Sequence, residues 1–403
     1  MNYGEIVRGQ FLKHRSAVWC LRILVALFLF ATYAPLLALD VPFWTDLSGT
    51  AAFPWFAALF DPAVFDLAVD AFFNLLMGTL PFAVAIWFLT RGRPRRGLLV
   101  AWCLLHVALF LWIQGARPDW RKPVRDYVRD AHAADANAVW PPVRHHPQRR
   151  LSEFSFTPPL HKGALVPGAA VEAPPDAIWP YFVLGSDNLG NDVLTRVLYG
   201  TRVSLTIGIV AIAIDVLIGI ALGAMAGYFG GWVDDLLMFF TQVVLVIPLL
   251  FLILFIMSVV EKPTIYHVML VIALVGWPSV MRLVRGEFLR QREIDYVTAA
   301  RALGVTSRRI MFRHIVPNTL APVFVYATFG VAGAILLEST IAFLGLGDPS
   351  APSWGQMLRI GYENKDTGRH LIWTGGLAIF AMVLVINVIG EALRDALDPK
   401  LRR

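Results

Sequence analysis

A polar, arginine-rich segment, Asp295–Pro317, separates two long apolar runs and has the residue spacing of a protein-docking element. Asp295 is placed as a helix N-cap, because its carboxylate can accept free N–H groups of the first helical turn. Gly304 stands where such a helix would end in a left-handed turn. Ala299 and Ala300 leave one helix face with little side-chain bulk. The surface of another protein can therefore approach this backbone closely.

A second short helix is expected after the turn at Gly304. Thr306 or Ser307 can cap it, and it would run to His314 before Pro317 opens the next apolar run. The segment is thus predicted to be helix, turn and helix outside the bilayer. The competing interpretation is an ordinary loop that is basic because of membrane topology.

Catalytic and metal-binding patterns are absent from the sequence. No lysine follows a glycine, so a phosphate-binding loop cannot be written, and no nucleophile elbow occurs. His145 and His146 lack a third ligand at a sensible spacing. Cys20 and Cys103 lie in apolar runs and suggest no disulfide framework. We therefore predict no catalytic residue, no metal site and no directly bound cofactor.

The composition indicates an integral membrane protein. Of the 403 residues, 57% are apolar and only 16% are charged, whereas a soluble domain has about a quarter charged residues. The mean hydropathy is +0.62. The net charge of +6 comes from arginines that flank apolar runs, which favours cytoplasmic loops over nucleic-acid binding.

The N-terminal part is predicted to contain three spans. Val18–Leu39 is interpreted as a retained first span with its N-terminus inside, since it is longer than the apolar region of a signal peptide. Asp40–Asp70 is expected at the membrane interface. Ala71–Leu89 and Leu98–Ile113 form a hairpin whose basic turn, Arg91–Arg96, is predicted to face the cytoplasm and to contact anionic membrane lipid.

The longest polar region, Ala116–Gly200, is rich in proline and is expected to be irregular and extracytoplasmic. Gly185 and Gly190 allow tight turns near its end. Asp192 and Arg196 are spaced as an i,i+4 pair on a short helix that precedes the next span.

The next span, Arg202–Gly227, carries three glycines at four-residue spacing, which let a neighbouring helix pack closely: Gly219, Gly223 and Gly227. Asp215 lies near the middle of this span. It is either a pore-lining or partner-facing polar site or a helix–helix hydrogen bond made by a partly protonated acid, and the sequence does not separate these two interpretations.

Four further spans are predicted, over 236–259, 265–283, 320–343 and 371–393. Pro248 should kink the first of them. Gln242 and Glu338 join Asp215 as candidate pathway or buried polar residues.

The order small-Ala-Ala-x-x-x-Gly, followed about a dozen residues later by Ile-Val-Pro, resembles the EAA motif of ABC-importer permeases. In that family the loop forms a coupling helix that docks on a cytoplasmic ATPase. The Asp-Tyr-Val lead-in and Arg313–Asn318 resemble the C-type subunit of dipeptide and oligopeptide (peptide/nickel) importers more narrowly. Thr298 stands where the family has Glu, which at N3 would complete a capping box. By this resemblance the ATPase-coupling residues are Asp295, Tyr296, Thr298, Ala299, Ala300, Gly304, Arg308, His314 and Pro317.

The resemblance covers residues 184–403 and implies an all-α membrane protein with the type I ABC-importer permease bundle. About eight transmembrane helices are expected, six of the family pattern plus the N-terminal hairpin, which would lie at the periphery. The expected parts are 1–40 (N-terminus and first span), 41–115 (interfacial segment and hairpin), 116–200 (extracytoplasmic loop), 201–395 (core, with the coupling loop 286–318) and 396–403 (cytoplasmic tail).

The same resemblance implies the partners and the location. A second, B-type permease subunit, two cytoplasmic ATPases that use ATP, and an extracytoplasmic solute-binding protein are expected, in a bacterial inner membrane with both termini cytoplasmic. A dipeptide, a longer peptide, a peptide antibiotic and a metal chelate all remain open as substrate.

Two other functions compete with this interpretation. A secondary transporter should show inverted repeats with broken spans at matching positions, and no such pairing is visible. A membrane enzyme or assembly factor would need a constellation of reactive residues in 116–200, and the scattered His and Asp residues form none.

Overall fold

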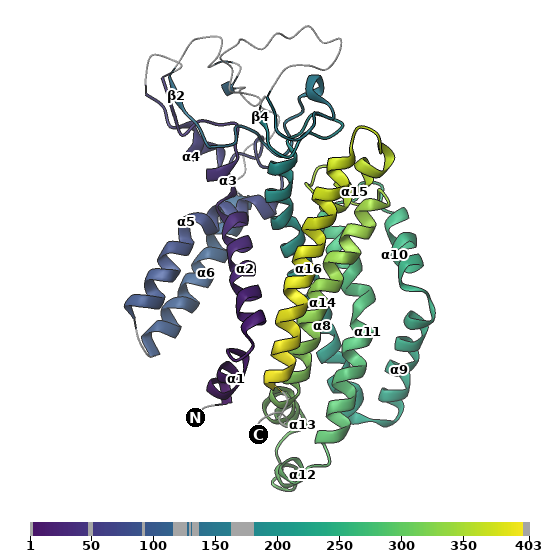
Figure 1. Cartoon of the computed structure of the whole chain (residues 1–403). Helices are drawn as coiled ribbons and strands as arrows, with labels where there is room; N and C mark the ends of the chain where they lie inside the picture. Colours follow the sequence, from purple (N-terminus) through teal and green to yellow (C-terminus); the bar gives the residue numbers. More distant parts are fainter. Residues whose placement is uncertain are drawn as a thin grey trace. The chain divides into compact units, whose positions relative to one another are not determined.

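The computed structural model describes residues 3–46, 51–90, 93–115, 127–128, 130, 137–162 and 181–397. Long helices dominate it (Figure 1). Contacts divide the chain into two compact units. Unit 1 is Met1–Val25, Ser204–Pro349 and Gly376–Arg403, and unit 2 is Ala26–Val203 and Ser350–Gly375.

Seven described helices are long and apolar enough to cross a membrane, and a bent pair adds an eighth span if it counts as one. This confirms the predicted all-α membrane fold with about eight spans. The helices are α2 (Arg15–Thr32), α5 (Ala68–Leu89), α6 (Arg93–Gly115), α8 (Val193–Phe229), α11 (Ile265–Gln291), α14 (Val316–Phe343, with the preceding turns) and α16 (Arg369–Leu397), and the bent pair is α9 (Gly231–Val246) with α10 (Leu249–Ser258).

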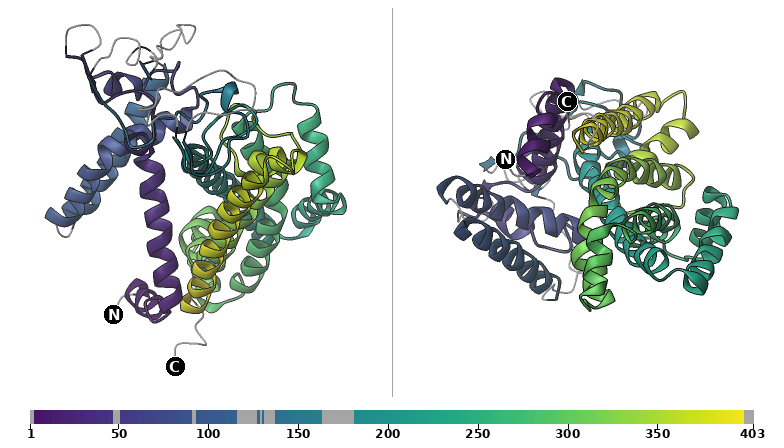
Figure 2. Two further views of the ribbon diagram at one scale, coloured as in Figure 1. Left: turned by 45° about the horizontal axis from the view of Figure 1, so that its top comes forward. Right: turned by 90° about the horizontal axis from the view of Figure 1, so that it is seen from below.

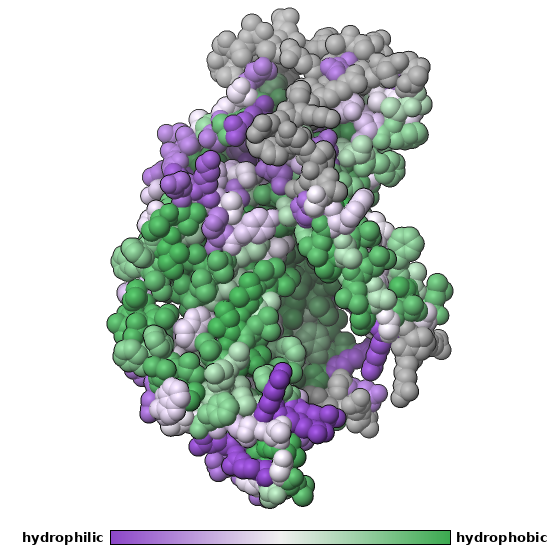
Figure 3. Space-filling model, turned by 180° about the vertical axis from the view of Figure 1, so that it is seen from behind, coloured by the Kyte–Doolittle hydropathy of each residue, from purple (hydrophilic) through white to green (hydrophobic). Residues whose placement is uncertain are grey.

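Unit 1 contains the helices that surround the Asp295–Pro317 segment. It is built from α1 (Tyr3–Phe11), the first part of α2, most of α8, the helices α9 to α14, and the last part of α16. Its buried core joins side chains of α8, α11, the 295–317 segment and α14. Apolar side chains cover much of the exposed helix surface, as the view in Figure 3 shows.

The pair α9 and α10 bends by 84° at Ile247 and Pro248. Ile247 is extended, with φ −77° and ψ 125°, and Pro248 is the N-cap of α10. The residue before a proline avoids the helical region, and proline offers no N–H to continue a helix. The predicted kink at Pro248 is therefore a complete break of the helix.

Unit 2 contains the hairpin of α5 and α6. Trp102 donates its indole N–H to the Thr79 carbonyl (3.1 Å), and the Thr79 hydroxyl lies 2.9 Å from His106 Nδ1. The first turns of α5 are buried and its last turns are exposed. The hairpin is therefore embedded at its root.

The polar region 116–200 was expected to be irregular, but its described part contains some regular structure. Two small antiparallel sheets occur in unit 2. In one, β1 (Trp44–Thr45) pairs with β2 (Ala138–Val139), and in the other β3 (His161–Lys162) pairs with β4 (Tyr181–Phe182). The described residues of the unit also form short helices: α3 (Ala34–Leu37), α4 (Pro54–Ala58), the 3₁₀ turn η1 (Ser152–Phe154) and α15 (Trp354–Glu363). Figure 2 shows the chain from two further directions.

The predicted short helix before the fourth span is instead the start of α8. Asp192 lies just before this helix and accepts hydrogen bonds from the backbone N–H and the hydroxyl of Thr195, both at 2.7 Å. The predicted Asp192–Arg196 pair is wrong, because Arg196 pairs with Asp187 at 3.2 Å. The Asp192 carboxylate is used as a helix cap rather than as an ion-pair partner.

Candidate functional site

The helix α12 (Asp295–Ala302) forms where the sequence predicts it, but one residue out of register at its start. Its N-cap is Ile294, whose carbonyl accepts the N–H groups of Val297 (2.9 Å) and Thr298 (3.2 Å). Asp295 is therefore the first helical residue, and its carboxylate makes no capping hydrogen bond. The predicted N-cap role is wrong, although a carboxylate in the first turn still favours the helix dipole.

The same shift changes the role of Thr298. It stands one position beyond N3, and the N-cap Ile294 has no side-chain acceptor, so a glutamate at position 298 would not complete the expected capping box. Instead, the Thr298 hydroxyl donates to the Asp295 carbonyl at 3.0 Å.

Gly304 ends α12 in the left-handed region, with φ of 77°. The Val305 N–H donates to the Ala300 carbonyl (3.1 Å), and the Gly304 N–H donates to the Arg301 carbonyl (3.0 Å). These two bonds are the pair that defines a Schellman motif. The turn therefore uses the conformational freedom of glycine and closes the helix tightly.

Polar contacts fasten α12 to the helices on either side. The Tyr296 hydroxyl donates to Oε1 of Gln291, at the end of α11, at 2.7 Å. Asn318, in the first turn of α14, donates to the Tyr296 hydroxyl (3.2 Å) and to the His314 carbonyl (2.9 Å). Hydrogen bonds therefore connect α12 to both α11 and α14.

Apolar contacts fasten the other face of α12. Val297 is fully buried in a cluster with Val284 and Phe288 of α11 and Ile310 and Ile315 of the following turns.

The two alanines of the predicted small-residue face of α12 differ in exposure. Ala299 is exposed, whereas Ala300 is half-buried and packs against the cluster of unit 1 itself. Ala300 thus serves the internal packing of this chain, and a bulky side chain there would first disturb unit 1.

The predicted second helix is not separate. The turn α13 (Ser307–Arg309) has Thr306 as N-cap, without a side-chain hydrogen bond, and leads into the π-helical turn η2 (Ile310–Ile315). This turn continues into α14, so Pro317 lies in a first helical turn rather than at a break. Proline has no N–H to donate, and the first turn is where a helix tolerates it.

The exposed surface of residues 295–317 combines apolar and basic side chains. Leu303 is 83% exposed and Phe312 is 56% exposed. The charged side chains of Arg301, Arg308 and Arg309 are also exposed. Hydrophilic side chains gather at this end of the molecule in Figure 3, where Figure 1 places α12 and α13. An exposed leucine within a cationic rim can dock into an apolar pocket that carries acidic groups.

The three glycines of α8 lie against α11. An added Cβ at Gly219 would be 2.4 Å from the Cβ of Val280, and one at Gly223 would be 2.6 Å from the Met281 carbonyl oxygen. One at Gly227 would be 2.5 Å from the Cβ of Phe288. The two helices therefore touch through their backbones along two turns.

The three polar residues at membrane depth do not share one environment. Asp215 is buried, and its Oδ2 lies 3.4 Å from the Tyr326 hydroxyl of α14, which donates to it. Glu338 is buried on α14, and the Ser339 hydroxyl donates to it at 3.3 Å. Gln242 is exposed on α9. The contacts of Asp215 favour the interpretation as a helix–helix hydrogen bond.

The two histidines considered as metal ligands are buried among aromatic rings in unit 2. His145 stacks on Phe182 at 4.9 Å between centroids, and His146 lies beside Phe65 at 5.3 Å. Burial lowers the pKa of both imidazoles, that of His145 to about 3. They act as neutral packing groups.

Sequence reasoning missed a buried cation in unit 2. Arg202 is fully buried and donates from Nε to the Ala31 carbonyl (2.7 Å), and from its other nitrogens to the Thr32 carbonyl (3.3 Å) and Asp70 (2.9 Å). The arginine therefore joins α8 to the end of α2 and the root of α5. A signal was present, since Asp70 and Arg202 each stand at the edge of an apolar run.

Comparisons with known proteins identify the family. Residues 219–403 match the model described as the binding-protein-dependent transport system inner membrane component. The dipeptide transport system permease protein DppC of Haemophilus influenzae is 38% identical over 225 residues, which are 56% of this chain and 76% of the relative.

Two further relatives carry other substrate names. The peptidoglycan transport system permease protein YejE of Agrobacterium fabrum is 33% identical over 293 residues, which are 68% of this chain and 74% of the relative. The glutathione transport system permease protein GsiD of Pectobacterium atrosepticum is 36% identical over 232 residues, 57% of this chain and 75% of the relative. Together with the apolar spans, these matches show that the chain belongs to the binding-protein-dependent inner-membrane permeases and is a non-catalytic, membrane-spanning subunit of an ABC importer.

Proposed function

We propose that this subunit moves peptides or peptide-like solutes inward. The support is that relatives with more than 70% of their length matched are named for dipeptides, glutathione and peptidoglycan, all of which contain amide-linked amino acids. Uptake of labelled dipeptides, tripeptides and glutathione into a deletion strain, with and without the restored gene, tests this proposal. Uptake that is unchanged for every amide-linked solute, together with a loss of metal-chelate uptake, would reject it.

The proposed assembly has four further subunits. A second permease of the B type completes the path, two cytoplasmic ATPases supply energy, and an extracytoplasmic binding protein delivers the solute. The family requires ATPase and binding-protein partners, and this stoichiometry is our proposal.

The proposed contact with an ATPase is α12 together with the turn at Gly304. One observation carries it: Leu303 is 83% exposed, although it lies directly beside a helix whose other face is packed into unit 1. The turn already fixes the backbone of Leu303, so docking orders only its side chain, whose burial contributes roughly 1.5–3 kcal/mol. Residues 295–317 would then act as a lever, because Tyr296 and Asn318 connect α12 to α11 and α14.

Leu303 gives a sharper test than the alanines. Leu303→Asp should abolish co-purification of the ATPases or weaken it about tenfold or more, because a carboxylate cannot be buried unpaired. Leu303→Met keeps the apolar surface and should retain the ATPases. Both variants alter an exposed side chain, so insertion and thermal stability should match the natural protein. Full ATPase retention in Leu303→Asp would reject this contact.

For the transport path, we propose that Gln242, rather than Asp215 or Glu338, meets the solute. Gln242 is exposed, while the two acidic residues are buried. Gln242→Leu should change the relative uptake rates of different peptides, and Asp215→Asn should change stability more than selectivity. The opposite pattern would make Asp215 a pathway residue.

A further inference from the structure

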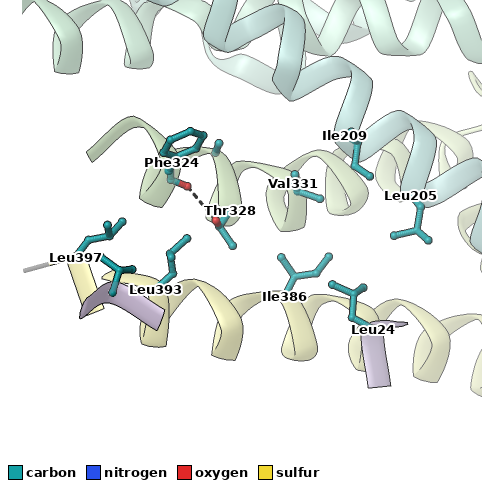
Figure 4. A pocket seen from close by; sticks show the side chains of 11 residues that line it. Leu24, Leu205, Ile209, Phe324, Thr328, Val331, Ile386, Leu393 and Leu397 are labelled. Carbon is teal, nitrogen blue, oxygen red and sulfur yellow. Dashed lines mark hydrogen bonds between the residues drawn. The ribbon is translucent and has the colours of Figure 1, made fainter. Parts of the chain in front are cut away.

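Unit 1 contains an apolar cavity of about 590 Å³ outside the segment 295–317. Figure 4 shows it between α14, α8 and α16, with Leu24 of α2 at one end. Its lining side chains are Val7, Leu24, Leu205, Ile209, Phe324, Ala327, Thr328, Val331, Ile386, Leu393 and Leu397. Thr328 is the single polar residue among them, and its hydroxyl donates to the Phe324 carbonyl at 2.9 Å.

This lining excludes a peptide as the occupant. A peptide would bring several backbone N–H and C=O groups into a cavity whose one polar side chain, Thr328, already donates its hydroxyl hydrogen. Each unsatisfied group costs several kcal/mol at membrane depth. The occupant must therefore be apolar over the length of the cavity.

The dimensions exclude a second helix that lies wholly inside the cavity. The lining residues of α16 run from Ile386 to Leu397, which is about 16 Å of helix at 1.5 Å per residue. A helix of 10–12 Å diameter over that length would fill about 1,300–1,800 Å³, which is more than the cavity holds. A narrow, flexible hydrocarbon chain fits the space better than a helix.

Basic residues follow a lining residue of this cavity closely in the sequence. Val7 of α1 is part of the lining, and the next residue, Arg8, is exposed. Lys13 and Arg15, in and after the turn between α1 and α2, are exposed as well. Residues 3–15 contain these three cations and one acidic residue, Glu5. Such a short basic segment beside a membrane attracts anionic headgroups.

We propose that the cavity holds one acyl chain of an anionic phospholipid, with its phosphate at Arg8, Lys13 and Arg15. The chain would pack α1 and α2 against α8, α14 and α16 of unit 1. Bound lipid would thereby link the first helices of the subunit to the helix that follows the 295–317 segment. This proposal does not depend on which solute the importer carries.

The first test measures phospholipid retained by the purified importer after detergent washing, by native mass spectrometry. Thr328→Phe fills the cavity and should remove the retained lipid. Thr340→Phe is the matched control, because Thr340 lies on the same helix, bonds to its own backbone in the same way (2.8 Å to the Leu336 carbonyl) and is outside the cavity. Equal lipid retention in the natural protein and in Thr328→Phe would overturn the proposal.

The second test concerns the headgroup. Delipidated importer is titrated with phosphatidylglycerol or phosphatidylcholine, and thermal stabilisation is followed. The natural protein should prefer phosphatidylglycerol, and each of Arg8→Gln, Lys13→Gln and Arg15→Gln should reduce this preference by about fivefold. Lys262→Gln, an exposed cation before α11 and outside residues 3–15, is the control and should leave the preference unchanged. No preference in the natural protein would overturn the assignment of an anionic headgroup.

The third test identifies the occupant directly. A photoreactive benzoylphenylalanine replaces Leu393, a lining residue, or Leu336, an exposed residue of α14 outside the cavity. After purification and illumination, a phospholipid adduct at position 393 but not at position 336 supports the proposal. An adduct with the second permease subunit at position 393, or no lipid adduct there, would overturn it.

Discussion

Gly304 holds the turn that ends α12 at a φ of 77°, and an added Cβ would meet nothing within 4 Å. The cost of a side chain at this position is therefore conformational and not steric. Gly304→Val should destabilise the turn by about 1–2 kcal/mol, because a β-branched residue is poorly tolerated in the left-handed region. Co-purification of the ATPases should fall severalfold while membrane insertion is unchanged.

The matched variant for this position is Gly304→Asn. Asparagine accepts the left-handed conformation better than other side chains, so this variant should keep most of the ATPase binding. If Gly304→Val retains the ATPases as well as Gly304→Asn does, the turn is not part of the contact.

His145 predicts a pH dependence of unit 2. Burial lowers the pKa of its imidazole from 6.5 to about 3, and the nearby charge of Arg149 adds to the shift. Between these values the unfolded chain binds a proton that the folded chain does not. The stabilisation is thus complete above about pH 6.5 and is lost as the pH falls, by about 1.4 kcal/mol per pH unit.

The variant His145→Phe isolates this contribution. It keeps a ring stacked on Phe182 and cannot titrate. Its melting temperature relative to the natural protein should rise as the pH falls from 6.5 to 5. The relative value is needed because burial also raises the pKa of Asp192 to about 6, which acts in the opposite direction: its contribution to stability is present at low pH and is lost as the pH rises toward 6. Parallel melting curves of the two proteins over this range would contradict the prediction.

At the scale of helices, α8 and α11 pack backbone to backbone along the three glycines. A methyl group at Gly223 would lie 2.6 Å from the Met281 carbonyl oxygen, and the backbone cannot rotate away as a side chain would. Gly223→Ala should therefore cost about 1–3 kcal/mol of stability, although alanine is the better helix former. Gly333→Ala is the control, since Gly333 lies in α14 with nothing within 4 Å of an added Cβ.

Melting temperatures of the two solubilised variants decide the matter. Gly223→Ala should melt lower than the natural protein and Gly333→Ala at the same temperature or higher. If both variants melt at the same temperature, α8 and α11 accommodate the added methyl group at Gly223 without a loss of stability.

The sequence predicts those parts of the fold that follow from local spacing. Apolar run lengths give the spans, four-residue spacing gives the glycine face of α8, and Gly304 marks the end of α12. The predicted start of α12 is one residue too late. The N-cap, Ile294, accepts hydrogen bonds through its backbone carbonyl only, so no side chain marks the cap in the sequence.

Other features depend on contacts between distant residues. Arg202 meets Asp70 across 132 positions of sequence, and Arg196 selects Asp187 over the closer-spaced Asp192. The role of Ala300 in internal packing depends on side chains from α11 and the turns after α13. No periodicity in the sequence specifies such partners.

The two halves of the hairpin formed by α5 and α6 differ in burial. Its distal turns expose Trp87, Phe88 and Leu89, as expected of a peripheral element in lipid. Its root is buried, and Asp70 is paired with Arg202 there. The proposal of a peripheral hairpin therefore applies to the distal half.

At the scale of the whole chain, the basic residues and the ends of the unit 1 helices agree on one orientation. Figure 1 shows the start of α1, the end of α16 and α12 at the same end of unit 1. Arginines of α11 and the 295–317 segment concentrate there: Arg282, Arg285, Arg290, Arg292, Arg301, Arg308, Arg309 and Arg313. Short basic loops resist translocation, so we propose that this end and both termini are cytoplasmic.

Single-cysteine labelling tests the orientation. In a background with Cys20→Ser and Cys103→Ser, Ser307→Cys reports the end that carries α12, and Glu153→Cys reports the described part of the region 116–200. Both positions are exposed, so access depends on the membrane alone. In sealed cells an impermeant maleimide should label Glu153→Cys and not Ser307→Cys, and permeabilised cells should show both labelled. Labelling of Ser307→Cys in sealed cells would reverse the topology and place the Leu303 surface where no ATPase can reach it.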